Sequence, residues 1–159
     1  MKRELFKNEI RLLSKSENIP YDLLLLADET KETIDRYVNV SEVFVYEISG
    51  VISGVYVFYA EDNIQIEIEN IAVATALQGA GIGSFLLNDA ERRAIHAGYQ
   101  AIIVGTPESS NILLQFYEKA GFIKYDRRVN FYIDNYREPI IENNVQLKDM
   151  IMLKKKLSD

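Results

Sequence analysis

The stretch Gln78-Gly79-Ala80-Gly81-Ile82-Gly83-Ser84 lies between a run of alternating apolar residues and a segment with helical periodicity. Glycines at the start of a helix leave backbone N–H groups uncovered, and these orphan donors together with the helix dipole favour a phosphate group. The predicted donors to a pyrophosphate are the amides of Gly79, Gly81, Gly83 and Ser84. This stretch therefore predicts a phosphorylated cofactor.

Two common glycine-rich loops do not match this stretch. A Walker loop requires a lysine followed by Ser or Thr after its last glycine, whereas Gly83 is followed by Ser84 and Phe85. The dinucleotide fingerprint requires a glycine at its sixth position, where Ser84 stands, and an acid at the end of the next strand. That strand, Ala101 to Val104, does not end in an acid. Neither ATP nor NAD is well supported.

The segments on either side of the loop predict a strand–helix–strand unit. Before the loop, Ile64 to Glu69 alternates isoleucine with polar residues, as a strand with two different faces does. After it, apolar residues recur every fourth position from Ile82 to Ala94, and Gly98 is placed to end this helix. The buried-type strand from Ala101 to Val104 follows. Such a unit makes a right-handed parallel crossover within one sheet.

The rest of the chain predicts further strands and helices around this unit. Val43 to Ile48 and Val51 to Tyr59 are aromatic and β-branched runs joined by Ser49-Gly50, which indicates an antiparallel hairpin. Other predicted strands are Ile10 to Leu13, Val129 to Ile133 and Met150 to Leu153. Other predicted helices are Tyr21 to Ala27, Thr30 to Val40, and a segment between the polar loop Thr106 to Ser110 and Gly121. We therefore expect one α/β domain over residues 1–159 with a mixed sheet.

Composition excludes several classes of site and partner. The chain has no cysteine, which rules out disulfides and thiolate chemistry, and its single histidine, His96, has no second histidine with which to hold a metal. The net charge of −6, from 24 acids and 18 bases, argues against nucleic-acid binding. Met1 to Lys7 has no signal-peptide core, and the leucine run Leu23 to Leu26 is too short to span a membrane. We expect a cytoplasmic protein without a metal.

Two motifs together resemble a known family. The first is Asn70-Ile71-Ala72-Val73 followed by Gln78-x-x-Gly81-x-Gly83, and the second is Phe116-Tyr117-Glu118-Lys119-Ala120-Gly121-Phe122. In this order, with a helix and a strand between them, they are similar to the GNAT superfamily of acetyl-CoA-dependent N-acetyltransferases. The resemblance implies a mixed, mostly antiparallel central sheet flanked by helices. It also implies transfer of an acetyl group from acetyl-CoA to a primary amine by direct attack.

The resemblance places acetyl-CoA on two neighbouring segments. Backbone groups of Ile71, Ala72 and Val73 would hold the pantetheine arm and the acetyl carbonyl, and the Val73 N–H would polarise that carbonyl. The loop would bind the pyrophosphate through Gln78, Gly79, Ala80, Gly81, Ile82, Gly83 and Ser84.

This sequence departs from the family pattern at two places near the cofactor. Many members carry Lys or Arg where Ala80 stands, so one cation near the phosphates is missing. An asparagine usually precedes the helix tyrosine by seven residues, whereas Ser110 occupies that position and Asn111 comes next. Either Ser110 or Asn111 could contact the pantetheine arm.

The predicted catalytic residues are a tyrosine and a pair of glutamates. In the family a tyrosine of the short helix protonates the leaving thiolate, and Tyr117 occupies that place; the alternative is an aromatic residue packed under the helix. The amine also needs a base, because an alkylammonium with a pKa of about 10.4 is protonated at neutral pH. Glu67 and Glu69 share a face of the strand that leads to the acetyl site, and Glu67 is preferred. The alternative is a solvated strand face.

The acceptor is not identified by any motif. The aromatic and acidic segment Asn130 to Pro139 could recognise an amine by carboxylate pairing and cation–π contact, or could form packing or a homodimer contact. A polyamine, an aminoglycoside, an amino acid, a protein N-terminus and a lysine side chain all remain open. So do two functions of other classes: a non-catalytic acyl-CoA sensor and a nucleotide-binding interaction module.

Overall fold

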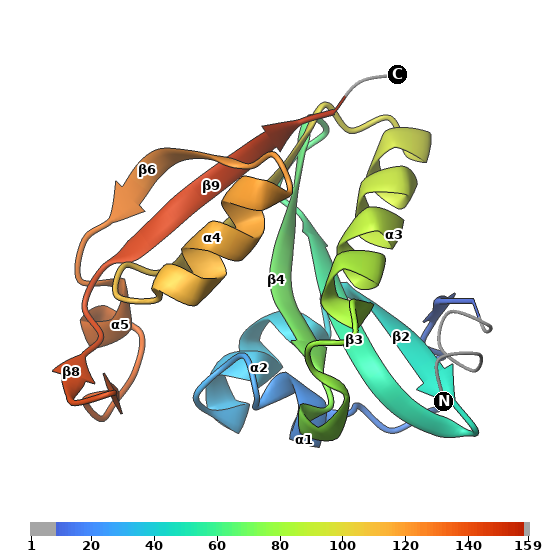
Figure 1. The fold of residues 1–159 in the computed structure, drawn as a ribbon, viewed down its shortest axis with the longest axis horizontal. Helices are drawn as coiled ribbons and strands as arrows, with labels where there is room; N and C mark the ends of the chain where they lie inside the picture. The colour runs from blue at the N-terminus through green and yellow to red at the C-terminus, as the bar shows by residue number, and fades with distance from the viewer. Residues whose placement is uncertain (1–8, 158–159) are drawn as a thin grey trace.

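A seven-stranded sheet in the order β1-β2-β3-β4-β5-β9-β6 forms the centre of the computed structural model (Figure 1). Its strands are β1 (Arg11–Leu12), β2 (Glu42–Ile48), β3 (Val51–Ala60), β4 (Gln65–Val73), β5 (Ala101–Pro107), β6 (Ile123–Arg128) and β9 (Met150–Lys156). A separate hairpin joins β7 (Ile141–Glu142) to β8 (Val145–Gln146). Only β4 and β5 pair in parallel among the described residues 9–157, so the mixed, mostly antiparallel sheet is confirmed. The expectation for Met1 to Lys7 concerns residues outside this range.

Helices cover both faces of the sheet. They are α1 (Tyr21–Leu24), α2 (Lys31–Val38), α3 (Ile82–His96), α4 (Asn111–Lys119) and α5 (Phe131–Asp134), with a short 3₁₀ turn, η1, at Thr75–Leu77. Helices α1 and α2 bury Leu24 and Ile34 against one face, together with Val55 of β3. On the other face, residues of α3 and α4 share a hydrophobic core that includes Leu86 and Leu114.

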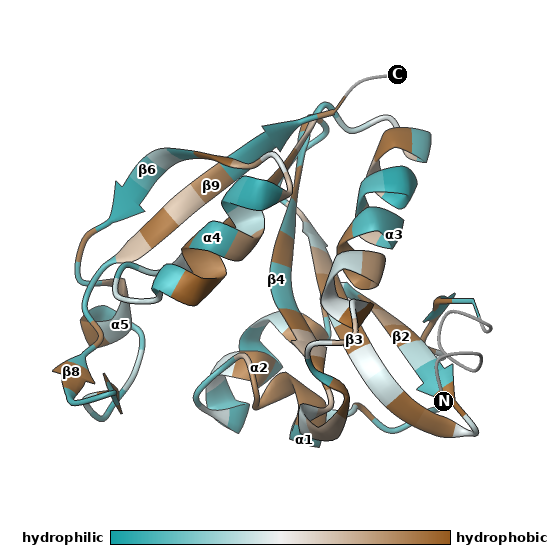
Figure 2. Cartoon of the chain, viewed as in Figure 1, coloured by the Kyte–Doolittle hydropathy of each residue, from teal (hydrophilic) through white to brown (hydrophobic). Residues whose placement is uncertain are grey.

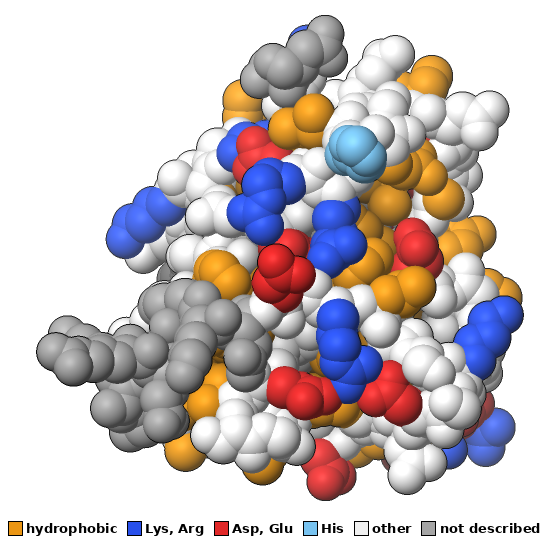
Figure 3. Space-filling model, turned by 90° about the vertical axis from the view of Figure 1, so that its right-hand side faces the viewer, with side chains coloured by type: hydrophobic (Ala, Val, Ile, Leu, Met, Phe, Trp, Pro, Cys, Tyr) orange, Lys and Arg blue, Asp and Glu red, His pale blue; other side chains and the backbone are white. Residues whose placement is uncertain are grey.

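Helix α3 follows the loop as its apolar spacing predicts. Ile82, Leu86, Ala90 and Ala94 are all buried, and Gly98 with a φ of 90° ends the helix region. Banding of hydrophilic and hydrophobic residues along α3 is visible in Figure 2. Truncating a buried leucine such as Leu86 costs about 2–5 kcal/mol, so this face anchors the loop firmly to the sheet. On the face of the molecule that Figure 3 shows, acidic and basic side chains are interspersed around the chain's single histidine, which is exposed.

Strands β4 and β5 pair over only part of their length. Parallel pairing joins Gln65–Ile68 to Ala101–Val104, whereas β4 continues to pair with β3 as far as Val73. Beyond Ile68 the two halves of the sheet diverge, as Figure 1 shows. The register between β3 and β4 also slips there, because Ile68 lies opposite Phe58 and Asn70 lies opposite Val57. Glu69 is thus the extra residue of a β-bulge, and the strict alternation expected for Ile64 to Glu69 ends at it.

Three predicted boundaries are wrong. The segment Val129 to Ile133 is not a strand: β6 ends at Arg128, Asn130 has a φ of 57°, and α5 begins at Phe131. β6 was not predicted; it is an edge strand that is almost entirely exposed, although Ile123 and Tyr125 alternate with Lys124 and Asp126. Strand β5 extends through Thr106 and Pro107, which were predicted to be loop, because β9 pairs with both of them. The helix predicted from Tyr21 to Ala27 ends at Leu24 and continues as turns.

Candidate active site

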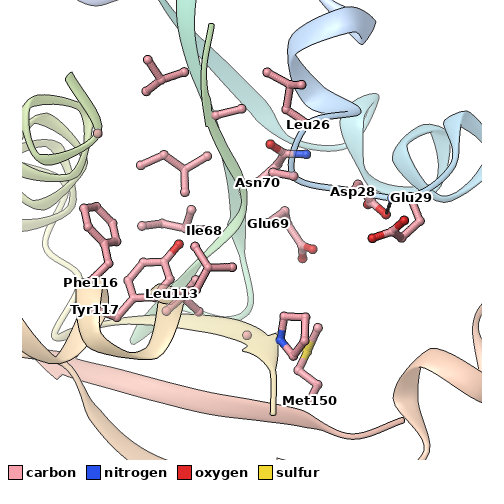
Figure 4. A pocket seen from close by; sticks show the side chains of 18 of the residues that line it. Leu26, Asp28, Glu29, Ile68, Glu69, Asn70, Leu113, Phe116, Tyr117 and Met150 are labelled. Carbon is pink, nitrogen blue, oxygen red and sulfur yellow. Dashed lines mark hydrogen bonds between the residues drawn. The ribbon is translucent and has the colours of Figure 1, made fainter. Parts of the chain in front are cut away.

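A cavity of about 820 Å³ lies where β4 and β5 diverge. Its walls come from the glycine loop and the start of α3, from β4, from the end of β5, from α4, and from the segments around α1, α2 and α5. Figure 4 shows side chains of these elements surrounding it. The volume is in the range of sites that hold a cofactor or a drug-sized ligand.

The glycine loop presents unpaired amides to this cavity. Gly79 and Gly81 have φ angles of 83° and 90°, a left-handed conformation that glycine adopts without a steric penalty. Gly81 is the N-cap of α3 and offers no side-chain cap, and the first helical bond runs from the Phe85 N–H to the Gly81 carbonyl at 3.0 Å. The amides of Ile82, Gly83 and Ser84 therefore remain available for an anion.

Most of the predicted loop residues line the cavity. They are Gln78, Gly79, Gly81, Ile82, Gly83 and Ser84, whereas Ala80 is not among the lining residues. The Gln78 side-chain amide donates to the Val73 carbonyl at 3.1 Å, which ties the loop to β4. The cationic residues that line the cavity are Arg36 and Arg128, and neither belongs to the loop. The loop therefore offers backbone donors, and no lysine or arginine of its own, to a pyrophosphate.

The open edge of β4 carries free backbone groups. The Ala74 N–H donates to the Ser53 carbonyl at 2.9 Å, and Ala72 lies opposite Val55 on β3. Because successive residues of a strand direct their N–H and C=O groups to alternate sides, the N–H groups of Ile71 and Val73 point away from β3. At this level β5 is no longer paired with β4. Ile71 and Val73 are thus placed to bind an extended ligand between the strands.

Tyr117 is packed in the core and also reaches the cavity. Its ring is 4% exposed and packs edge-on against Phe116 and Phe122 in the core. Its hydroxyl is directed toward β4 in Figure 4, and the residue lines the cavity. Burial raises the pKa of Tyr117, so the phenol keeps its proton at neutral pH and can donate it.

The other α4 residues predicted to contact the cofactor lie elsewhere. Ser110 is the N-cap of α4, Asn111 is exposed, and neither lines the cavity. The apolar side chains of the next two residues, Ile112 and Leu113, do line it. The pattern of polar residues in the motif gave no signal for these two.

Glu67 and Glu69 both line the cavity. Glu67 is only 6% exposed, so the solvated-face alternative is wrong for this residue. Its Oε1 lies 3.9 Å from the Arg128 guanidinium. Burial raises the pKa of both carboxyls, the charge of Glu69 raises that of Glu67 further, and Arg128 acts in the opposite direction. The pair can therefore share one proton near neutral pH, which suits a general base.

A polar network that the sequence did not reveal lies in the cavity wall around Asp28. Asp28 accepts hydrogen bonds from the hydroxyls of Tyr37 at 3.0 Å and Tyr136 at 2.6 Å. The Asn70 side-chain amide donates to the Tyr37 oxygen at 3.1 Å and to the Leu24 carbonyl at 3.0 Å. These bonds connect β4, α1, α2 and the segment after α5. No spacing rule links residues so far apart in sequence.

The aromatic segment from Asn130 to Pro139 contributes to the cavity wall. Phe131, Tyr132, Asn135 and Tyr136 line it. Tyr132 also packs with Ile140 and Leu147 in a small core of its own. This segment therefore both packs in a small core of its own and lines the cavity.

Sequence comparison identifies the family of this chain. The profile of the acetyltransferase (GNAT) family matches residues 10–122. The chain belongs to the GNAT family. An N-acetyltransferase of Bacillus subtilis (strain 168), the uncharacterized YvbK, is 37% identical to this GNAT protein over 147 residues, which are 92% of this chain and 95% of the relative. The expected enzyme class, an N-acetyltransferase, is thereby confirmed.

Solved structures of GNAT proteins share the whole fold. An acetyltransferase from Elizabethkingia anophelis with acetyl-CoA bound is 44% identical, with a TM-score of 0.90 over 94% of this chain and 97% of its own. A Bacillus subtilis acetyltransferase in complex with CoA is 36% identical, with a TM-score of 0.84 over 94% and 99%. Within residues 9–157, no helix is both long and apolar enough to span a membrane, and no three acidic, His or Cys side chains are grouped to hold a metal.

Proposed function

We propose that this GNAT protein transfers the acetyl group of acetyl-CoA to a primary amine of a small molecule or peptide by direct attack. Acetyl-CoA as cosubstrate is confirmed by the family and by relatives that hold acetyl-CoA or CoA. The observation that carries the proposal is one cavity lined by a proton donor, Tyr117, and a proton acceptor, the Glu67–Glu69 pair. The loop amides and the free edge of β4 lie on the same cavity and suit the cofactor.

The proposed reaction needs three proton transfers around the acetyl carbon. The glutamate pair removes a proton from the acceptor ammonium, which frees the nitrogen lone pair. The nitrogen then forms a bond to the carbonyl carbon, while the Val73 N–H stabilises the negative charge on the oxygen. The C–S bond breaks, Tyr117 gives its proton to the departing thiolate, and the attacking nitrogen loses its remaining extra proton to solvent.

The buried carboxyl pair supports the base assignment by its pKa. A carboxyl with an ordinary pKa near 4.3 is too weak a base to accept a proton from an ammonium group efficiently at neutral pH. Burial and mutual repulsion raise the pKa of the pair toward the working pH, which improves proton acceptance. Glu67 is the more buried of the two, and it remains the preferred base.

The pH dependence of kcat/KM tests this proposal. Calorimetry first measures acetyl-CoA binding, and thiol release then measures turnover of an amine panel by the native protein. Activity should rise with pH as the pair loses its proton, and Glu67→Gln should abolish most of that rise. Glu69→Gln tests the other assignment, and Glu42→Gln, an exposed acid outside the cavity, is the control. If both cavity variants keep the native profile, the glutamate base is wrong.

A further inference from the structure

The cavity extends well beyond the proposed reacting centre. Figure 4 shows Phe116 and Tyr117 on one side of it, Asp28 and Glu29 on the opposite side, and Glu69 between them. A bound amine that reaches Glu69 therefore leaves space toward Asp28 and Glu29. The side chains around that space indicate what the rest of the acceptor carries.

Two acids at this remote end have no cationic partner. Glu29 and Glu142 both line the cavity, and neither takes part in any ion pair of residues 9–157. Partial burial, the contact with Glu142 and the charge of Asp28 raise the pKa of Glu29. Asp28 is already bound by tyrosine hydroxyls, so Glu29 and Glu142 are the carboxyls left for a ligand. A cation between them would relieve their repulsion.

The arginines that line the same cavity are engaged elsewhere. Arg36 donates to the Asn135 carbonyl at 3.1 Å and pairs with Glu32 at 3.5 Å. Arg128 faces Glu67 at 3.9 Å. Neither guanidinium forms an ion pair with Glu29 or Glu142.

Tyrosine rings accompany these acids. Tyr132 and Tyr136 are stacked with ring centroids 6.0 Å apart, and both line the cavity. Burial raises the pKa of Tyr132, and the charges of Asp28, Glu142 and Glu29 raise it further. Carboxylates combined with aromatic rings bind an ammonium group by ion pairing and cation–π attraction.

A buried acceptor atom of the cavity wall also lacks a donor. Asn70 is 4% exposed and lines the cavity, and its Oδ1 has no hydrogen-bond partner, whereas its Nδ2 is bound twice. Buried polar atoms in native proteins are nearly always paired, so an unpaired acceptor beside a cavity points to a ligand with N–H donors. An amine has several such donors.

We propose that the acceptor is an aliphatic diamine or longer polyamine, whose second cationic nitrogen is held by Glu29 and Glu142 at the end of the cavity remote from Tyr117. This inference rests on the proposed amine acetylation and names its substrate class. An acceptor with a neutral or acidic far end would leave the two carboxylates uncompensated or repelled.

A matched pair of acceptors tests the second cation. The amines 1,5-diaminopentane and 5-amino-1-pentanol have the same length and differ in the charge of the far end. The native protein should show a kcat/KM for the diamine at least about tenfold higher, as one charge-assisted contact predicts. Calorimetric titration of the protein–CoA complex with the same two amines should show the same order without depending on turnover.

Variants then locate the contact. Glu29→Gln and Glu142→Gln should each bring the diamine-to-amino-alcohol ratio close to one, while Glu42→Gln, which removes an equal charge outside the cavity, should keep the native ratio. Glu142 is exposed in the short β7–β8 hairpin, so its variant retains the fold even if the change at Glu29 disturbs the loop between α1 and α2.

The outcomes separate the two proposals. Turnover of both amines at similar kcat/KM, or a diamine preference that survives both cavity variants, would overturn the second-cation site and leave amine acetylation intact. Acetyl-CoA binding without turnover of any amine in the panel would overturn the acetylation proposal, and the diamine inference with it.

Discussion

The cofactor side and the acceptor side of the cavity are built in different ways. The cofactor side consists of one continuous segment, β4 followed by the glycine loop and the start of α3, and it works mainly through backbone N–H groups. The proposed acceptor side gathers side chains from the segment after α1 and from α2, β4, α5 and β7, which are distant in sequence. Backbone recognition leaves a local signature of glycines, whereas side-chain recognition by distant segments leaves none.

Tyr117→Phe should have the largest effect on the reaction. Without a proton donor for the thiolate, kcat should fall by about 10²-fold or more, while acetyl-CoA affinity changes far less. Steady-state kinetics and calorimetry on the same samples measure the two quantities. Tyr125→Phe, an exposed tyrosine outside the cavity, is the matched control. Equal losses of affinity and kcat would assign Tyr117 to the cofactor side and remove it from the chemistry.

Gly81→Val should weaken the cofactor side selectively. The φ of 90° at Gly81 is strained for a β-branched residue, so the first turn of α3 must shift and misalign its free amides. Acetyl-CoA affinity should fall by about tenfold or more. The preference between the two acceptor amines should persist at saturating acetyl-CoA. If that preference disappears as well, the two sides are not independent.

Gly105→Ala should act on the acceptor side through packing. A Cβ at this position would lie 2.3 Å from Met150 Sδ, so the methionine, which lines the cavity, must move. Overpacking of this kind costs about 1–3 kcal/mol, and the acceptor KM should rise a few-fold with acetyl-CoA affinity maintained. Urea unfolding and initial rates measure the two effects. The double variant with Met150→Ala should recover stability; no recovery would exclude the proposed clash.

The smallest of the predicted effects is the change in the free energy of unfolding caused by Glu67→Gln. The pKa of Glu67 is raised in the folded protein, so the native state holds this proton more tightly than the unfolded chain. The stabilising contribution of this proton to the free energy of unfolding is therefore fully present below the unfolded-state pKa of about 4.3. It is lost as the pH rises through the raised pKa of Glu67 in the native state.

The glutamine variant removes this pH dependence. Relative to the native protein it should be more stable by about 1–2 kcal/mol at pH 9 and nearly equal at pH 5, as measured by urea unfolding. Glu42→Gln, exposed on β2, provides the baseline. A stabilisation that is the same at both pH values would indicate that the Glu67 charge plays no part.

The elements that the sequence predicted correctly all have strong local periodicity. Helix α3 from Ile82 and the hairpin turn at Ser49-Gly50 belong to this group. Strand β6 was missed because an edge strand needs no apolar face, and the predicted strand from Val129 stops at the left-handed Asn130. Periodicity reports burial on one face, so elements that bury little are invisible to it.

For the candidate site as well, the sequence located some residues and missed others. Tyr117 and the loop were located from motifs, and the two glutamates from strand alternation, and all of them line one cavity. Ser110 and Asn111, predicted as possible contacts of the pantetheine arm, do not line the cavity, whereas the next two residues, Ile112 and Leu113, do. Arg128 was missed because it follows a stretch with no recognisable pattern.

By itself, the sequence determined the cofactor loop, the parallel crossover that holds it, and the tyrosine after it. Short-range rules govern these features, since glycine conformation, helix capping and hydrophobic spacing act over a few residues. Tertiary structure alone decided the proposed acceptor side, where Asp28, Glu29, Tyr132 and Glu142, from segments distant in sequence, line one cavity. It also decided the raised pKa of Glu67, because burial and the charge of a neighbour depend on how distant segments pack.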